Sequence, residues 1–296
     1  MPIDRIAIFG TGLIGASVGL ALRSQGYSGA IAGWDPNQDE LAIAEATGAV
    51  SSIAPDPLIT ARESQLILLC GPVFTILEWL DRLAPVVQSG QVVTDVGSVK
   101  RAICEQARGR YGLVHTAGFL PGHPMAGKEV SGAINADAKL FDGAAWLFTE
   151  TADSRSMHPA SRAVADEWRE WTKKFGCRVL DLDPGRHDVL CAWVSHLPQY
   201  LSTALSALLE DEFPDKDEML AVGGRALREM TRLGGSSFSM WRDIAHTNTA
   251  AISDALSALE QRLTHLRENL KTPELRAEFE RANRFRADMG KPKPDS

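Results

Sequence analysis

A glycine-rich turn near the start of the chain has the spacing that binds the pyrophosphate of a dinucleotide. The pattern G-x-G-x-x-G follows an apolar run and is formed by Gly10-Thr11-Gly12-Leu13-Ile14-Gly15. In such a turn the first glycine permits the tight bend, the second admits the pyrophosphate, and the third lets helix pack on strand. The phosphates then lie at the N-terminus of the following helix, where backbone N–H groups are unpaired. We therefore predict a dinucleotide site at this turn.

An acidic residue indicates which dinucleotide this site takes. Asp35 ends the second expected strand, about 20 residues after Gly15. A carboxylate there accepts hydrogen bonds from ribose hydroxyls and repels a 2′-phosphate, and residues 34–38 contain no basic side chain that could hold one. The sequence therefore favours NAD over NADP. Gly71 and Pro72 follow a later strand, where a plain turn and a cofactor contact are both open.

Three further segments combine polar side chains with glycine or proline turns. They are Asp95-Val96-Gly97-Ser98-Val99-Lys100, Gly122-His123-Pro124-Met125-Ala126-Gly127 and Ser195-His196-Leu197-Pro198-Gln199. Ser98 stands where it could cap an expected helix over residues 98–108, because serine oxygens accept hydrogen bonds from helix N-termini. We expect Lys100 to be a solvated lysine in the first turn of that helix.

The order of these segments resembles the prephenate dehydrogenase family, the prephenate and arogenate dehydrogenases of tyrosine biosynthesis. The resemblance covers roughly residues 4 to 270, and His187-Asp188 before the Ser-His-Leu-Pro segment strengthens it. It implies oxidative decarboxylation of a cyclohexadienyl substrate with a nicotinamide cofactor. It also implies a Rossmann domain followed by a helical dimerisation domain, and hence a homodimer.

The resemblance also implies roles for individual side chains. His123 would contact the ring hydroxyl of the substrate, where a neutral imidazole could accept the hydroxyl proton as hydride leaves the same carbon. Ser98 would hydrogen-bond the same region of substrate and nicotinamide, and His187 and His196 would line the cleft. Arg232 would bind a substrate carboxylate, which suits its planar fork of donors. The structural alternatives are a capped loop for His123, a core position for His187 and His196, and an ion pair for Arg232.

Two departures from the family pattern bear on substrate choice. Gln199 stands where many members have a second histidine, and residues 236–238 are Ser-Ser-Phe where Asp-Pro is common. An uncharged amide attracts a pyruvyl carboxylate less than a charged histidine would, and it can accept a hydrogen bond from an ammonium group. We expect Gln199 near the substrate side chain, and the choice between prephenate and arogenate stays open.

The surrounding pattern predicts the elements that position these residues. Apolar runs at 5–10, 30–35, 64–71, 91–97, 112–119, 144–150 and 177–183 alternate with helical periodicity, which predicts an α/β fold with a parallel sheet covered by helices on both faces. After residue 183 only helical periodicity remains. We predict a Rossmann-type NAD-binding domain over 1–183, an all-helical substrate and dimerisation domain over 184–290, and a disordered tail over 291–296.

Composition excludes several other classes of protein. The chain has 296 residues, a net charge of −7 and four widely spaced cysteines, so a disulfide scaffold, a metal site and a nucleic-acid partner are not expected. No targeting or membrane segment is evident, which favours a cytoplasmic protein. The leading hypothesis is an NAD-dependent prephenate dehydrogenase. The alternatives are an arogenate or dual-specificity cyclohexadienyl dehydrogenase and, from another class, a non-catalytic NAD-sensing protein.

Overall fold

The computed structural model describes residues 3–150 and 156–289 and separates into two compact units, Met1–Thr249 and Ala250–Ser296. This division concerns compactness alone, so the domain boundary near residue 183 stays a prediction. The tail predicted over 291–296 lies outside the described residues. Within the described part of the chain, every helix is too short or too polar to cross a lipid bilayer.

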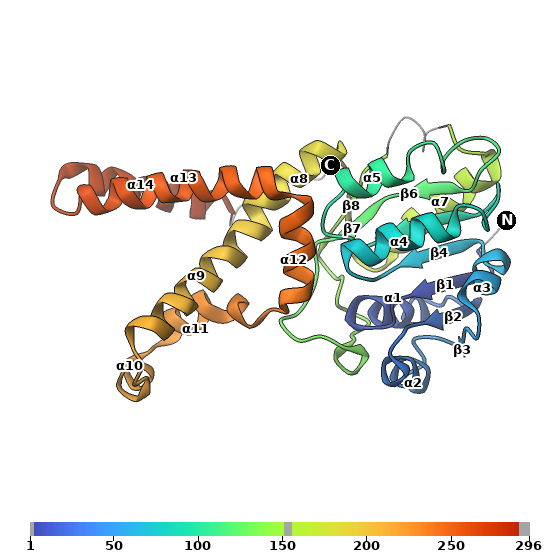
Figure 1. Cartoon of the computed structure of the whole chain (residues 1–296), viewed down its shortest axis with the longest axis horizontal. Coiled ribbons are helices and arrows are strands. Elements are labelled where there is room, and N and C mark those ends of the chain that lie inside the picture. The colour runs from blue at the N-terminus through green and yellow to red at the C-terminus, as the bar shows by residue number, and fades with distance from the viewer. Residues whose placement is uncertain (1–2, 151–155, 290–296) are drawn as a thin grey trace. The chain divides into compact units, whose positions relative to one another are not determined.

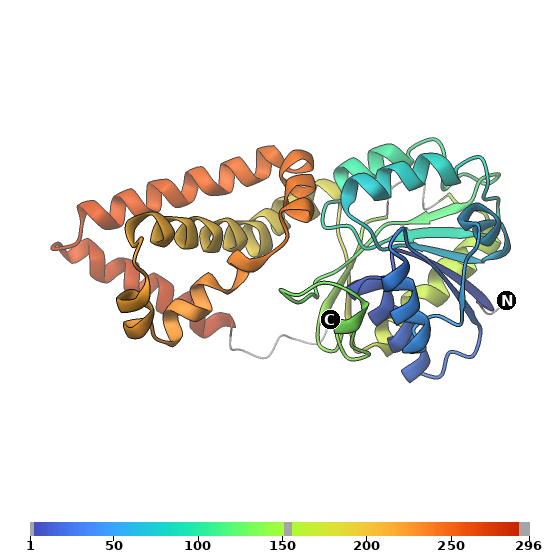
Figure 2. The same ribbon diagram turned by 60° about the horizontal axis from the view of Figure 1, so that its bottom comes forward.

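A six-stranded parallel sheet forms the centre of the first unit (Figure 1). Its order is β3-β2-β1-β4-β5-β6, which is the order of the dinucleotide-binding fold. The strands are β1 (Arg5–Phe9), β2 (Ala30–Trp34), β3 (Ser52–Ile53), β4 (Leu66–Leu69), β5 (Val92–Asp95) and β6 (Gly118–Leu120). The predicted α/β fold is confirmed. All four side chains of β4 are buried, because helices cover both faces of the sheet (Figure 2).

The helices of this part follow the expected alternation with strands. They are α1 (Leu13–Ser24), α2 (Gln38–Ala46), α3 (Pro57–Glu63), α4 (Val73–Leu83), α5 (Arg101–Ala107) and α7 (Pro159–Lys174), with a 3₁₀ turn η1 (Ala133–Asn135). The short β3 and α3 were not predicted from the sequence. The strand expected over 112–119 is reduced to β6, because the chain turns at Gly112, which has a φ of +78°.

A second, three-stranded sheet carries the histidine of the Gly-His-Pro segment. It consists of β7 (Gly122–Pro124), β8 (Ala145–Phe148) and β9 (Arg178–Asp181), in that order. Strand β7 runs antiparallel to β8 and pairs His123 with Leu147, while β9 runs parallel to β8. Two tryptophans anchor this layer, since Trp146 and Trp168 are fully buried with ring centroids 5.7 Å apart.

The rest of the first unit is helical, as predicted. It comprises α8 (Pro184–Cys191), a π-helical turn η2 (Ala192–His196), α9 (Leu197–Glu212), α10 (Asp217–Val222), α11 (Arg225–Thr231), η3 (Arg232–Gly235) and α12 (Phe238–Thr247). Helix α8 starts directly after residue 183, because the Asp183 carboxylate caps the N–H groups of Gly185 and Arg186. Helices α10 and α11 are separated at Gly223 and Gly224, consistent with the low helix propensity of glycine.

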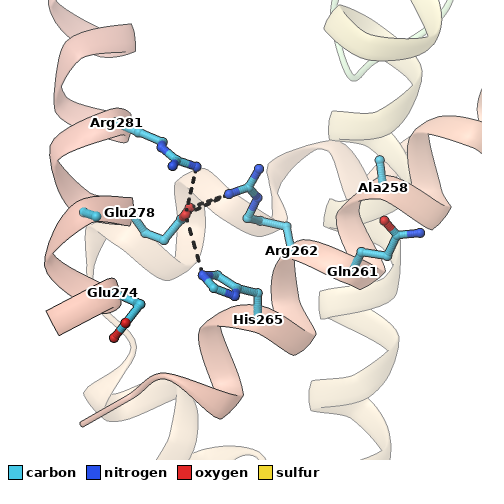
Figure 3. Close-up of a pocket in the computed structure, with 8 residues that line it drawn as sticks. Ala258, Gln261, Arg262, His265, Glu274, Glu278 and Arg281 are labelled. Carbon is cyan, nitrogen blue, oxygen red and sulfur yellow. Dashed lines mark hydrogen bonds and ion pairs between the residues drawn. The ribbon is translucent and has the colours of Figure 1, made fainter. Parts of the chain in front are cut away.

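The second unit consists mainly of α13 (Thr249–Glu268) and α14 (Pro273–Met289). Between these helices lies a hollow of about 530 Å³ (Figure 3). Glu278 accepts bonds there from Arg262 at 2.8 Å and Arg281 at 3.2 Å, with His265 at 3.9 Å. The Glu278 carboxylate is thus already paired with side chains of the same two helices. All residues that line the hollow come from α13 and α14. None of the site residues predicted from the sequence lines this hollow.

Candidate active site

The glycine turn after β1 has the shape that a dinucleotide requires. Gly10 has a φ of +98°, and a Cβ there would lie 2.6 Å from the carbonyl oxygen of Cys70. A Cβ on Gly15 would lie 1.9 Å from the carbonyl oxygen of Gly10. A Cβ on Gly12, by contrast, would meet nothing within 4 Å. Protein packing therefore explains Gly10 and Gly15, whereas Gly12 keeps open space in front of α1.

The start of α1 provides unpaired donors beside this space. Leu13 begins the helix, Ile14 packs against the core, and no side chain caps the N-terminus or places an acid in the first turn. Asp35 accepts a hydrogen bond from the N–H of Thr11 at 2.8 Å, so it lies against the glycine turn at the end of β2. A free helix N-terminus and a carboxylate at the neighbouring strand end fit a pyrophosphate and a ribose.

The turn after β4 lies against the glycine turn. Pro72 is the N-cap residue of α4, and Gly71 precedes it in the tight link from β4. The carbonyl of Cys70, which Gly10 must accommodate, fixes the contact between the two turns. Both turns are at the carboxyl edge of the sheet, where the order passes from β1 to β4 and where open sheets bind ligands.

The segment after β5 differs from its sequence prediction. Helix α5 begins at Arg101 with Lys100 as its N-cap, so Ser98 does not cap it, because the helix starts three residues later than expected. Ser98 is half-buried, and its hydroxyl makes no hydrogen bond within the described residues. Lys100 is 0% exposed rather than solvated, because its ammonium pairs with the buried carboxylate of Asp95.

Asp95 connects this segment to the strand that carries His123. Its Oδ2 accepts the N–H of Gly97 at 2.8 Å as well as the Lys100 ammonium. Its Oδ1 accepts the N–H of Gly122 at 3.2 Å, at the start of β7. Burying a carboxylate is costly unless hydrogen-bond donors surround it, as they do here. The Asp95 carboxylate therefore positions the backbone directly before His123.

Two histidines and an aspartate form a continuous hydrogen-bonded chain. His123 Nδ1 lies 2.9 Å from His187 Nε2, and His187 Nδ1 lies 2.8 Å from Asp188 Oδ1. All three side chains are buried. Asp188 also accepts the N–H groups of Lys100 at 2.6 Å and Arg101 at 3.0 Å. The Asp188 carboxylate therefore accepts hydrogen bonds both from His187 and from the N-terminus of α5.

The hydrogen-bond partners determine which nitrogen of each ring carries the proton. The Asp188 carboxylate only accepts, so His187 donates from Nδ1 and accepts at Nε2. His123 then donates from Nδ1, which leaves its Nε2 as the free basic atom. Burial, and secondarily the neighbouring His187, lowers the pKa of His123 well below 6.5, so the ring is neutral at pH 7. Burial would raise the pKa of Asp188, but the bonds from His187 and the α5 backbone outweigh it and lower that pKa.

His196 presents a second buried imidazole. Its Nδ1 lies 3.3 Å from the amide nitrogen of Asn248, which also donates to the Asp188 carbonyl at 2.9 Å. The amide donor leaves the ring proton on Nε2, and this atom is buried without a partner among the described residues. Burial lowers the pKa of His196 to about 4. A buried, unpaired donor is costly, which is typical of a group whose partner is a ligand.

Gln199 and Arg232 both make contacts within the chain. Gln199 is 4% exposed, donates to the carbonyl of Leu233 at 2.7 Å, and accepts from Ser236 Oγ at 3.0 Å. It therefore holds the η3 turn, which begins at Arg232. The Arg232 guanidinium pairs with Glu129. The expected contacts of Gln199 and Arg232 with substrate stay predictions.

Several contacts of this cluster were not predicted from the sequence. The sequence analysis identified the segment from Asp95 to Lys100 but not the buried ion pair between its ends. Asn248 has its partners 52 and 60 positions away, so spacing gives no signal for it. Cys191 could have been noticed, because it follows His187 by four residues and such pairs share a helix face. The Cys191 Sγ lies 3.6 Å from His187 Nε2.

Comparison with known proteins assigns the chain to a family. Two family models match the chain, the nucleotide-binding domain of prephenate dehydrogenase over residues 18–172 and its dimerization domain over residues 183–286. Prephenate dehydrogenase from Lactococcus lactis subsp. cremoris is 29% identical over 268 residues, which is 89% of this chain and 70% of that protein.

Solved structures agree over nearly the whole length. Prephenate dehydrogenase from A. aeolicus in complex with hydroxyphenyl propionate and NAD⁺ is similar at 25% identity and a TM-score of 0.84, covering 98% of this chain and 99% of that one. Arogenate dehydrogenase from Synechocystis is similar at 29% identity and a TM-score of 0.74, covering 96% and 99%. Since the two family models together match most of the sequence, the chain belongs to the prephenate dehydrogenase family of oxidoreductases.

Proposed function

We propose that the chain is an NAD-dependent prephenate dehydrogenase that converts prephenate to 4-hydroxyphenylpyruvate. The observation that carries the proposal is the hydrogen-bonded series from Asp188 through His187 to His123. These bonds leave Nε2 of His123 free, and burial keeps the His123 ring neutral by lowering its pKa. A neutral imidazole held in one tautomer is suited to accept a hydroxyl proton.

The cofactor site is the glycine turn with Asp35. NAD⁺, when bound, supplies the hydride acceptor. The start of α1 would hold its pyrophosphate, Gly12 would leave room for it, and Asp35 would accept hydrogen bonds from the ribose hydroxyls. Thr11, Leu13 and Ile14 shape this turn, and Gly71 and Pro72 border it at the end of β4.

His123 acts on the ring hydroxyl of the substrate. As hydride leaves the carbon bearing that hydroxyl, Nε2 of His123 takes the hydroxyl proton and the carbonyl forms. The imidazolium that results is stabilised through His187 by the Asp188 carboxylate, which stays ionised. Loss of CO₂ and aromatisation of the ring then make the reaction effectively irreversible. His187 is therefore a positioning residue in this proposal rather than a substrate contact.

Three other side chains bind the substrate in the proposal. His196 donates from its unpaired Nε2–H, and Ser98 hydrogen-bonds the region of the ring hydroxyl and nicotinamide. Arg232 exchanges Glu129 for a substrate carboxylate, to which its guanidinium can donate two parallel hydrogen bonds. Gln199 supports Arg232 through η3. On a protein with a net charge of −7, such local donors must supply the attraction for an anionic substrate.

A direct assay tests the reaction. Formation of NADH is followed with NAD⁺ and prephenate, then with NAD⁺ and arogenate, at matched concentrations. A higher kcat/KM with prephenate supports the proposal. The 29% identity to an arogenate dehydrogenase favours arogenate as the second candidate, and a higher kcat/KM with arogenate would establish that alternative. No turnover of either substrate by folded protein that binds NAD would indicate a non-catalytic NAD-sensing protein.

Cofactor preference has its own test. The Asp35 carboxylate disfavours a 2′-phosphate, so kcat/KM with NAD⁺ should exceed that with NADP⁺ by about tenfold or more, which is about 1.4 kcal/mol. Replacing Asp35 with Ser should reduce this ratio. Equal kcat/KM values for the two cofactors in the wild-type protein would contradict the role of Asp35.

The same proposal includes a homodimer in the cytoplasm. The dimerization-domain match over residues 183–286 supports self-association through the helical part. Several exposed apolar side chains there have no cover within the described chain, Val222 at 80% and Phe238 at 78% among them. All four cysteines are free, as expected in a reducing compartment.

A further inference from the structure

The proposed base, His123, and two neighbouring side chains have the chemistry of metal ligands. His123, His187 and Cys191 are all buried, and one ligand atom from each lies within 4.8 Å of the other two. His123 Nδ1 and His187 Nε2 are 2.9 Å apart, and the Cys191 Sγ lies 3.9 Å and 3.6 Å from them. We propose that these three side chains form an inhibitory Zn²⁺ site that switches the enzyme off.

The distances suit tetrahedral zinc. With Zn–N of about 2.0–2.1 Å and Zn–S of about 2.3 Å, tetrahedral angles set separations of about 3.3 Å between nitrogens and about 3.5 Å between nitrogen and sulfur. The two rings would move apart by a few tenths of an ångström, and the sulfur would approach by a similar amount. Two imidazoles and a thiolate are ligands that zinc prefers, and a fourth position remains for water.

The residues around the three ligands strengthen this assignment. His187 directs Nε2 toward the cluster while its Nδ1–H donates to Asp188 at 2.8 Å. A carboxylate behind a ligating histidine is the usual support for zinc, because it fixes the tautomer and makes the ligand more basic. Asp188 is itself fixed by two backbone N–H groups. His187 therefore already has the tautomer that metal binding through Nε2 requires.

Zinc at this position would inhibit the base by changing its tautomer. Zn²⁺ displaces the thiol proton of Cys191, which goes to solvent, and bonds to the resulting thiolate. It also takes the lone pair of His187 Nε2 and the Nδ1 position of His123. The proton on His123 Nδ1 then moves to Nε2, because a neutral imidazole that binds metal through Nδ1 carries its proton on the other nitrogen. Nε2 becomes a donor and cannot accept the hydroxyl proton.

Entry of the ion requires local opening, since the three ligands are buried. Cys191 ends α8 and is followed directly by the π-helical turn η2, whose Trp193 and Val194 are exposed. π-helical turns are rarer than α-helical turns and often occur at functional positions. Inhibition should therefore develop slowly after zinc is added and be reversed slowly by EDTA.

Binding is tested first, without any assay of turnover. Co²⁺ replaces Zn²⁺ in the same geometry and gives a thiolate-to-cobalt charge-transfer band in the near ultraviolet. The wild-type protein should show this band at one equivalent of Co²⁺, and Zn²⁺ should abolish it. Cys191→Ser should lose the band and weaken Zn²⁺ binding on the order of 100-fold or more, since even supporting residues of zinc sites contribute 10- to 100-fold.

Matched controls keep the test decisive. Cys177→Ser alters another buried cysteine, whose thiol donates to the Phe141 carbonyl at 3.4 Å and is not part of the proposed ligand set, so this variant should keep the band. If Cys191→Ser fails to fold, separate serine variants of Cys70, Cys104 and Cys177 that all keep the band assign it to Cys191 by elimination. No band in the wild-type protein, or a band that persists in folded Cys191→Ser, would overturn the site.

The inhibitory effect rests on the proposed function, whereas the cobalt band does not. With prephenate and NAD⁺, Zn²⁺ should inhibit the wild-type enzyme and Cys177→Ser, while Cys191→Ser keeps turning over at the same zinc concentration. A cobalt band without turnover would count against the proposed reaction and leave the metal site standing. Turnover that zinc inhibits equally in Cys191→Ser would overturn the inhibitory role.

Discussion

At the scale of single residues, hydrogen bonding decides what each imidazole can do. The two histidines of the buried pair differ because one faces a carboxylate and the other does not, so only His123 has a free nitrogen. The Gly-His-Pro turn and the His187-Asp188 pair indicated that these two histidines matter. The sequence did not indicate that His123 and His187 are in contact, because they are 64 positions apart and lie on separate elements.

The lowered pKa of His123 determines the acid limb of the rate profile. Catalysis needs the neutral ring, and a pKa well below 6.5 keeps the ring neutral as pH falls through 6.5. We expect kcat to stay constant through this range and to drop only at lower pH. His123→Ala should bind NAD⁺ normally and lose about 10² to 10⁴ in kcat, as expected for a general base. A normal kcat with an unchanged acid limb in His123→Ala, and the loss of both in His196→Ala, would identify His196 as the base.

Lys100 and Asp95 form a buried ion pair, and loss of either partner should destabilise the fold. Removing one member of a buried ion pair leaves the other charge uncompensated, which costs about 3–5 kcal/mol. Lys100→Met should therefore lower the free energy of unfolding by about that amount in urea denaturation, because Asp95 loses its partner. Lys139→Met, at an exposed position, should change it by less than about 0.5 kcal/mol. Equal small changes in both variants would show that Asp95 does not need the ammonium.

At the scale of elements, short turns place the binding groups. Strand β7 has three residues and the η3 turn has four, and both are too short for a periodic signal. The long alternation of strands and helices was predictable because apolar runs and glycine turns are local properties. The position of Arg232 was not, because it depends on the side chain of Gln199 from another helix.

Gln199 should act on substrate binding through η3. Gln199→Ala removes the donor to the Leu233 carbonyl and the acceptor for Ser236, so η3 should loosen. We expect KM for prephenate to rise about tenfold with a smaller change in kcat, in the same direction as Arg232→Gln, because a charge-assisted hydrogen bond is worth about 1.5–3 kcal/mol.

The control for this prediction is Thr203→Val. That change removes one partner of Gln199, at 3.1 Å, and leaves both contacts with residues 233–236 in place, so KM should stay near the wild-type value. Gln199→His should in addition move the prephenate-to-arogenate ratio of kcat/KM toward prephenate if this position senses the substrate side chain. An unchanged KM in Gln199→Ala would show that η3 is held by other contacts.

At the scale of the whole molecule, we expect the exposed apolar surface of the helical part to pack against a second copy of the protein. Val222, at 80% exposed, is a site where a charge would oppose association without disturbing the core. Wild-type protein should sediment as a dimer, and Val222→Glu should shift the equilibrium toward monomer. Val114→Glu, an exposed apolar position of the Rossmann part, should leave the mass unchanged. A monomeric wild-type protein at micromolar concentration would contradict the homodimer.

The bidentate capping of α5 by Asp188 has a consequence for how the chain folds. Helix α5 lacks a side-chain cap of its own, and the carboxylate that satisfies its first N–H groups comes from 88 residues further along. Until α8 docks, α5 therefore begins with unsatisfied donors, and Asp188 has no backbone partner there. Docking of α8 stabilises the start of α5, and a formed α5 in turn stabilises docked α8. The Rossmann part and α8 should therefore melt in one cooperative transition. A fragment ending at residue 183 would keep its sheet and glycine turn, yet it would fray at α5, beside the loop that holds Ser98.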